Sequence, residues 1–482
     1  MLFNSIEFAV FFPIVIIGLF TLPQHWRRYW LLAASLVFYM SWSIPFVLLI
    51  FYTTTIDYFV AKRIAAESIA HRKKLWLALS LSTNFGVLIF FKYANFFLSS
   101  VSAISVWKGG APILPLTFII LPIGISFYTF EAVSYTIDVY RGVSPAEKNY
   151  LRLLLFILFF PKLIAGPIER ARHLIPQFDK YVEFDEARVV DGLRLMLWGF
   201  FKKMVIADRL AGIVDQVFNM PSGYTGASTL VATYMFAFQI FCDFSAYSDI
   251  AIGAARIMGF DLFENFRRPY AARTIQEFWQ RWHISLSTWF RDYVYLPLGG
   301  SRVTPARWYL NIAIVFLVSG LWHGANWTFV VWGALHGAYM IGGVLTRPIR
   351  THIWEMVTGI PGAKQVRSVV AWGVTFHLTV FAWIFFRANT LSDAVTLVRH
   401  LFSWPTESLH PLIAVIGHRQ LMIAIALVAA LEFIQWLERR TDMRYFLTTQ
   451  PTWIRWPTYY GLGFAIVFLG VLEAKQFIYF QF

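Results

Sequence analysis

His323 is the residue whose surroundings most clearly favour chemistry. It lies in a long apolar run and is flanked by Gly320 and Gly324. Glycine permits close backbone approach and local unwinding of a helix. An imidazole kept away from water should be neutral near pH 7, the state that takes a proton from a hydroxyl group. The alternative is a structural role, in which His323 bonds a neighbouring carbonyl group.

Two neighbours extend this candidate site. Trp322 precedes the histidine, and Asn326 follows it by three positions. The amide of Asn326 would suit an oxyanion that develops during acyl transfer. Trp322 and Asn326 are therefore predicted to shape the site and contact the substrate.

His283 is the second candidate, and a predicted helix positions it. Residues 274–277 (TIQE) form a capping box, which predicts a helix that begins at Ile275. Continued through residue 289, that helix would carry an apolar stripe for packing and, on another face, Gln280, His283 and Ser287. A polar face among membrane spans should point at partners or at a water-filled cavity. We predict that His283 is catalytic and that Gln280, Ser287 and Arg281 bind substrate.

Other kinds of site have less support in the sequence. No G-x-S-x-G element accompanies Ser287 or Ser319, which argues against a serine hydrolase. No two histidines lie three or four residues apart, and H-E-x-x-H is absent, so we expect no metal site. The single cysteine, Cys242, excludes an internal disulfide and is expected to be buried. For His336 and His377 we favour a packing role.

Asp243 and Asp249 lie in an apolar run, where each carboxylate costs at least about 2.5 to 3.5 kcal/mol unless it is paired or hydrated. Both therefore need partners. A proton path in a transporter would use them, but bonds that hold irregular backbone in place explain them as well. We favour the structural role.

The elements that must position these residues are membrane helices. Of 482 residues, 58% are hydrophobic and only 14% are charged, unlike a soluble domain. Long apolar runs recur throughout the chain, and the net charge of +14 fits basic cytoplasmic loops better than nucleic-acid binding. We expect no removable signal at the N-terminus, because no basic region precedes residues 8–22.

The apolar runs predict an all-α, polytopic membrane protein with roughly 10 to 12 spans, arranged as a single domain over residues 1–482. A break at residues 41–45 divides the run 29–61 into two. Residues 121–128 (LPIGISFY) and 160–167 (FPKLIAGP) are expected to interrupt spans and to line a cavity. The other runs cover residues 8–22, 75–97, 114–133, 151–164, 193–213, 230–254, 308–321, 327–345, 369–386, 412–436 and 459–471.

Several motifs in order resemble those of the membrane-bound O-acyltransferases, in the branch of the bacterial alginate O-acetyltransferase membrane subunits. The resemblance covers nearly the whole chain. The motifs are residues 91–96 (FKYANF), 121–128 (LPIGISFY), 165–167 (AGP), 243–249 (DFSAYSD), 277–287 (EFWQRWHISLS), 291–293 (RDY), 322–326 (WHGAN) and 384–388 (IFFRA).

The resemblance implies a ring of membrane helices around a central funnel, with re-entrant or interfacial helices, in the bacterial inner membrane. It implies that His323 matches the catalytic histidine of the family and His283 its second active-site position; Tyr128 is taken with them as a substrate-binding residue. No bound cofactor is implied. The implied donor is acetyl-CoA or another cytoplasmic acyl donor, and the implied partner is a separate extracytoplasmic acetyltransferase that modifies an exopolysaccharide.

Two departures leave the acceptor open. Ala246 stands where the alginate branch is expected to have glycine, and the sequence ends at Phe482 without a long extra tail. Cellulose, peptidoglycan or teichoic acid are alternative acceptors. Two other classes of protein also remain: a proton-coupled transporter that uses Asp243, Asp249 and His323, and a scaffold that only holds other subunits in the membrane.

Overall fold

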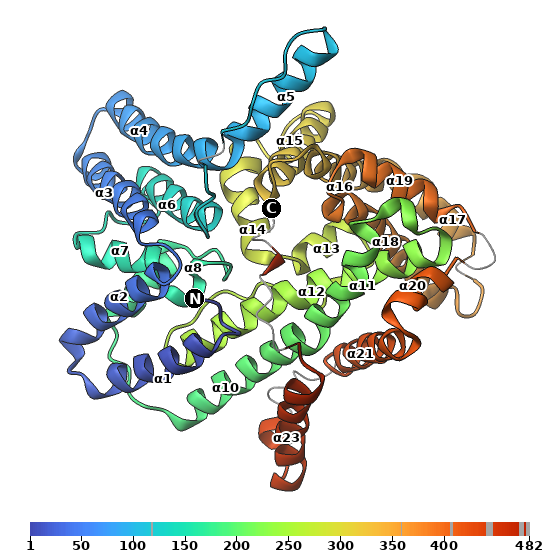
Figure 1. Cartoon of the computed structure of the whole chain (residues 1–482). Coiled ribbons are helices and arrows are strands. Elements are labelled where there is room, and N and C mark those ends of the chain that lie inside the picture. The colour runs from blue at the N-terminus through green and yellow to red at the C-terminus, as the bar shows by residue number, and fades with distance from the viewer. Residues whose placement is uncertain (117–118, 358, 405–407, 440–446, 472–476, 479–482) are drawn as a thin grey trace. The chain divides into compact units, whose positions relative to one another are not determined.

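The structure is a computed structural model of the whole chain. It describes residues 1–482 except 117–118, 358, 405–407, 440–446, 472–476 and 479–482. The described residues form helices joined by loops and contain no strand (Figure 1). Contacts divide the chain into two compact units, residues 1–196 with 247–263 and residues 197–246 with 264–482. The single domain expected over residues 1–482 stays a prediction.

The first unit is built from the N-terminal helices and parts of two later ones. The break predicted at residues 41–45 is confirmed, since α2 ends at Met40 and α3 begins at Ile44. Its helices are α1 (Ile6–Thr21), α2 (Gln24–Met40), α3 (Ile44–Ala66), α4 (Ala70–Leu88), α5 (Ala94–Trp107), α6 (Ile125–Tyr140), α7 (Tyr150–Leu158), α8 (Phe160–Leu163), α9 (Ala171–Leu174), most of α10 (Glu186–Phe200) and the end of α12 (Gly226–Ile257).

Two predicted spans of this unit differ in the structure. The run 114–133 is not one helix, and the interruption predicted at residues 121–128 is confirmed, because α6 begins only at Ile125, after Gly124 with a φ of 76°. That conformation favours glycine, and a Cβ at this position would lie 2.6 Å from the carbonyl oxygen of Leu163. The run 75–97 is longer than predicted, since a π-helical turn (Ile89–Tyr93) joins α4 to α5.

The second unit contains the remaining helices. The predicted run 327–345 coincides with α16, and α15 extends the run 308–321 by a few residues at each end. The helices are α11 (Asp208–Phe218), the first part of α12, α13 (Ile275–Arg281), α14 (Ile284–Phe290), α15 (Pro305–His323), α16 (Trp327–Leu345), α17 (Arg347–Met356), α18 (Ala363–Arg387), α19 (Leu391–Leu401), α20 (His410–Ile416), α21 (His418–Leu437) and α23 (Thr452–Leu469).

Short helical turns connect several of these elements. They are the π-helical turns Phe201–Ala207 and Arg291–Tyr295 and the 3-10 turns Ile175–Asp179, Pro221–Gly223 and Pro269–Ala271. In the described part of the chain, six helices are long and apolar enough to cross a membrane. The larger number of spans predicted from the apolar runs includes shorter helices such as α1, and it stays a prediction.

Candidate functional site

The segment that carries His283 is two short helices rather than the single helix that the sequence predicts. Thr274 caps α13 as predicted, its hydroxyl accepting the backbone N–H of Glu277 at 3.0 Å. The helix nevertheless ends at Arg281, and His283 adopts a left-handed conformation with a φ of 45° before α14 begins. The prediction of one polar helix face was therefore wrong. Its members separate, with Gln280 exposed and His283 buried.

Asn265 explains the break, and sequence reasoning did not find it. Its backbone carbonyl accepts the N–H of Ile284 at 3.0 Å, and its side-chain oxygen accepts the hydroxyl of Ser285 at 2.9 Å. These tertiary bonds outweigh the local preference for a continuous helix and hold the left-handed turn, a conformation that costs energy in a residue other than glycine. The sequence signal that could have found it is the stretch 261–303, which contains Asn265 and is rich in charged and aromatic residues between strongly apolar neighbours.

The same side chain orients the ring of His283. Nδ1 of His283 lies 3.1 Å from Oδ1 of Asn265. A carbonyl oxygen only accepts, so Nδ1 carries the proton and Nε2 is the acceptor nitrogen of the neutral ring. His283 is fully buried and lies outside the six candidate spans, and burial lowers its pKa well below the ordinary value. The ring is thus a neutral base with a defined tautomer.

His323 is the last residue of α15 and is 2% exposed. Gly324 ends the helix in extended backbone, and a Cβ there would collide with the ring of Phe329. Aromatic rings surround the imidazole, with centroids 5.0 Å away at both Trp322 and Trp332 and 5.3 Å away at Phe386. The predicted placement of His323 in an apolar environment is confirmed.

Small residues bring α15 and α16 close enough to form this environment (Figure 1). A Cβ on Gly320 would collide with the carbonyl oxygen of Phe329, and a Cβ on Gly333 would collide with that of Phe316. Glycine at both positions therefore allows the two backbones to touch. Trp332, which is one residue from Gly333 on α16, is in this way held against His323.

Trp322 joins the two predicted histidines into one site. Its ring centroid lies 5.0 Å from that of His323 and 6.0 Å from that of His283. Trp322 is 3% exposed, so the contact is inside the protein. A residue pair that the sequence separates by 40 positions is therefore brought together around one buried indole.

The other predicted site residues are placed as follows. Asn326 caps α16, since its oxygen accepts the N–H of Thr328 at 3.0 Å and its amide donates to the carbonyl of Asn389 at 2.9 Å. Arg281 pairs with Glu277 at 2.5 Å, and the hydroxyl of Ser287 donates to the carbonyl of Trp282 at 3.2 Å. Their substrate contacts stay predictions.

Tyr128 is buried in α6 and belongs to the first unit, whereas the two histidines belong to the second, and its role in substrate binding stays a prediction. His377 is exposed, and its Nδ1 lies 2.7 Å from the carbonyl of Gly373, one turn earlier. Cys242 is fully buried, as expected. The described residues include no cluster of three or more histidine, cysteine or acidic side chains suited to a metal ion. The absence of a metal nevertheless stays a prediction.

Asp243 has the partners that a structural carboxylate requires. Its carboxylate lies 2.7 Å from Nζ of Lys203 and accepts the backbone N–H of Ile478 at 2.8 Å. Lys203 also pairs with Asp208 at 2.8 Å. These contacts favour the structural role of Asp243 over a proton path, which weakens the transporter alternative.

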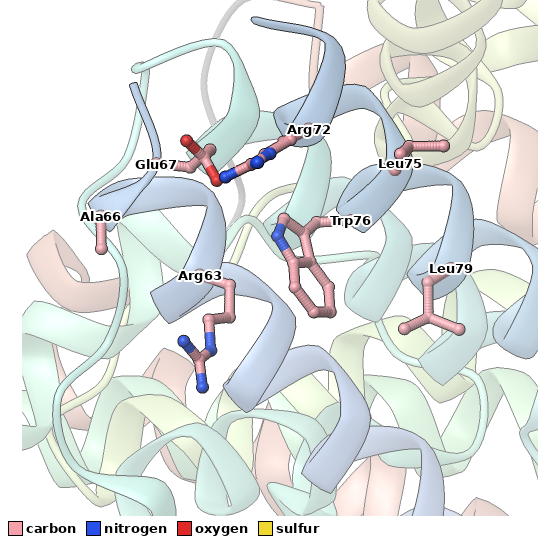
Figure 2. A pocket seen from close by; sticks show the side chains of 7 residues that line it. All are labelled: Arg63, Ala66, Glu67, Arg72, Leu75, Trp76 and Leu79. Atoms are coloured by element: carbon pink, nitrogen blue, oxygen red, sulfur yellow. The ribbon is translucent and has the colours of Figure 1, made fainter. Parts of the chain in front are cut away.

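A cavity in the first unit lies between the end of α3 and the start of α4 and contains none of the predicted site residues (Figure 2). Arg63, Glu67, Arg72 and Trp76 line it. Its basic and aromatic lining, next to two candidate spans, is typical of the boundary between membrane and water. The cavity therefore fits the basic face expected from the charge balance, and the histidine site stays the predicted place of the chemistry.

Comparison with known proteins places the whole chain rather than individual site residues. The model of the MBOAT, membrane-bound O-acyltransferase family, matches residues 32–372. The "Probable alginate O-acetylase AlgI" of Pseudomonas aeruginosa is 41% identical over 414 residues, which cover 86% of this chain and 77% of the relative. The peptidoglycan O-acetyltransferase of Helicobacter pylori is 35% identical over 83% of this chain and 79% of the relative. The teichoic acid D-alanyltransferase of Bacillus subtilis is 28% identical over 55% of this chain and 68% of the relative.

Proposed function

Because this chain belongs to the membrane-bound O-acyltransferase family, we propose that it takes an acetyl group from cytoplasmic acetyl-CoA and passes it across the membrane. The acetyl group then serves the O-acetylation of an exopolysaccharide such as alginate. A separate extracytoplasmic acetyltransferase completes the modification, and the chain resides in the bacterial inner membrane. That the chain is a membrane acyltransferase is the premise, and the donor, the direction of transfer and the partner are the proposal.

One observation carries the chemical part of the proposal: two buried histidines share the indole of Trp322. A neutral imidazole in such a site takes a proton from an attacking hydroxyl efficiently, since no water competes for it. His283 is further prepared by Asn265, which holds its proton on Nδ1. The site thus supplies a base and an aromatic wall for an uncharged acyl group.

The proposed reaction uses these groups in two steps. The acceptor hydroxyl oxygen attacks the carbonyl carbon of the thioester while its proton passes to a nitrogen of His323. The tetrahedral intermediate then breaks its C–S bond, and the proton passes from His323 to the leaving thiolate. His283 orients the donor or the acceptor during both steps. Without His323 the hydroxyl would have to attack with its proton in place, which is slower by about 10² to 10⁴.

The polymer that finally receives the acetyl group is an exopolysaccharide in this proposal, because the relatives with 38 to 41% identity carry the name alginate O-acetylase. Peptidoglycan and teichoic acid remain acceptors to compare, since the names of other relatives contain them. Cells that make each polymer can be tested for ester-linked acetyl groups with and without this chain. A chain that acetylates peptidoglycan alone would contradict the exopolysaccharide proposal.

The decisive experiment removes the base and supplies the donor. Membranes that contain the wild-type chain should transfer radiolabelled acetyl groups from acetyl-CoA, and His323→Ala should lower the rate at least about 100-fold. His377→Ala is the matched control, because His377 is exposed and bonds only its own helix in the described structure. Retention of full activity by a folded His323→Ala protein would sink the proposed role of His323.

A further inference from the structure

A third histidine, His336 on α16, lies next to the site and has an unusual environment. It is fully buried, and neither ring nitrogen has a hydrogen-bond partner among the described residues. Six aromatic rings surround it at centroid distances of 5.0 to 6.4 Å. They belong to Trp279, Trp332, Tyr339, Phe278, Phe316 and Trp383. The sequence predicted a packing role for His336. An apolar ring of similar size would fill the same space, so packing alone does not explain why this residue carries ring nitrogen atoms.

Two of the surrounding rings share this property. Nε1 of Trp279 and Nε1 of Trp332 are also buried and have no hydrogen-bond partner in the described part of the chain. The rings of Trp279, Trp332 and His336 contact one another pairwise, at 5.0, 5.0 and 5.7 Å. Three polar side chains without protein partners thus form one cluster, here called the His336 cluster.

Such a cluster is costly unless a ligand completes it. A buried polar group left without a partner costs about 1 to 3 kcal/mol, and a buried tryptophan N–H usually has an acceptor. A phenylalanine at position 336 would pack against the same rings without that cost. The conflict between local stability and residue type is the pattern expected of a functional site.

The chemistry of the cluster restricts the ligand. Each indole N–H only donates, whereas a neutral imidazole donates with one nitrogen and accepts with the other. No charged side chain is among the six rings that enclose His336. The matching group is an uncharged oxygen that accepts two hydrogen bonds in an aromatic enclosure. The carbonyl oxygen of an acyl group and the oxygen of a water molecule share this chemistry.

One member of the cluster, Trp332, also contacts the proposed catalytic residue His323. The ring of Trp332 lies 5.0 Å from the ring of His323 and 5.0 Å from that of His336. We propose that His336, Trp279 and Trp332 bind an uncharged oxygen, of the acyl substrate or of an ordered water, beside His323. This inference rests on the proposed function, since it takes the ligand to belong to the acyl-transfer reaction.

The test replaces the imidazole by a ring of similar shape. His336→Phe should unfold at the same or a higher temperature, because a buried group without a protein partner is removed. Its rate of acetyl transfer from acetyl-CoA should nevertheless fall about tenfold, as expected for the loss of a hydrogen bond made to the reacting group. His377→Phe makes the same change at an exposed position and should leave the rate unchanged.

Steady-state kinetics with acetyl-CoA separate the two sources of oxygen. If the oxygen belongs to the acyl group in the ground state, the KM for acetyl-CoA should rise in His336→Phe. If it belongs to water, kcat should fall while KM stays constant. Trp279→Phe and Trp332→Phe each keep one aromatic ring but lose the N–H donor and part of the indole. A smaller decrease in the rate of acetyl transfer is expected for each than for His336→Phe.

Three outcomes decide the inference. A folded His336→Phe protein with the wild-type rate overturns it. If His336→Phe fails to fold, wild-type rates in both tryptophan variants overturn it instead. Full activity of His323→Ala would contradict the proposed function, whereas an inactive His323→Ala beside a fully active His336→Phe would contradict only the role of the His336 cluster.

Discussion

A buried polar cluster of the first unit and the two buried histidines of the second unit have different surroundings. In the first unit Asp57 accepts the hydroxyl of Ser80 at 2.5 Å and the amide of Asn84 at 2.9 and 3.0 Å. In the second unit the rings of His323 and His336 are enclosed mainly by aromatic rings. Hydrogen-bonded polar clusters of the first kind specify and stabilise packing. The polar atoms of the two histidines in the second unit lie in aromatic surroundings, which costs free energy. Such a placement is typical of residues that bind a ligand or take part in chemistry.

The largest expected effect concerns a buried ion pair of the first unit. Lys162 is completely buried and pairs with Glu131, which also accepts the backbone N–H of Glu169 at 3.0 Å. Lys162→Met should destabilise the protein by about 3 to 5 kcal/mol, because it leaves Glu131 buried without its counter-charge. Unfolding in detergent measures this loss.

The double variant Lys162→Met with Glu131→Leu is the matched control for that prediction. It removes both charges, so most of the lost stability should return. The contrast between the units would break if Lys162→Met left stability unchanged and instead abolished acetyl transfer at temperatures where the protein is folded. In that case the pair would belong to the chemistry rather than to the packing.

A second prediction sharpens the functional side of the contrast. Asn265→Ala removes the acceptor that keeps the proton of His283 on Nδ1, so acetyl transfer should fall about tenfold. Asn265→Asp keeps an acceptor and adds a charge that raises the pKa of His283. Its activity should therefore reach half-maximum at a higher pH than in the wild type.

The pH profile of the Asn265→Asp protein is the informative measurement, since a purely structural asparagine would not move it. Stability is measured in parallel for both variants, because Asn265 also bonds Ser285 and Ile284. An unshifted profile together with an equal loss of stability in both variants would assign Asn265 to packing alone.

These residues show how far the sequence predicts the molecule. Uninterrupted apolar runs predicted the helices well, as the coincidence of residues 327–345 with α16 shows. The placement of His323 followed from its run and its glycines. Interruptions were harder, because the turn at His283 depends on Asn265, which lies 18 positions earlier. No local periodicity contains such a tertiary bond.

The His336 cluster was missed for a related reason. A lone histidine in an apolar helix is usually packed or satisfied, and the sequence offered nothing to separate His336 from His377. The structure separates them, because His377 is exposed and bonds Gly373, whereas His336 is enclosed by rings from four helices. Burial and the partners of individual nitrogen atoms emerge only from the three-dimensional packing.

The smallest expected effect lies at a hydrogen-bonded histidine of the first unit. Nδ1 of His173 is 2.8 Å from the buried carboxylate of Glu169, and its ring stacks on Phe263 at 4.3 Å. The hydrogen bond with Glu169 raises the pKa of His173. A histidine with a raised folded-state pKa contributes its full stabilisation below the ordinary pKa of about 6.5 and loses it as the pH rises through the folded value.

Stability should therefore decrease on going from pH 6 to above the raised pKa of His173, by at most about 1 kcal/mol because the pair is partly exposed. His173→Gln keeps a hydrogen-bond donor for Glu169 but does not titrate, so it should flatten this part of the profile. Acetyl transfer by His173→Gln should equal that of the wild type at every pH in the range. If the variant instead shifts the pH profile of transfer, His173 takes part in the reaction. The contrast between a packing role for polar side chains in the first unit and a chemical role in the second would then fail for this histidine.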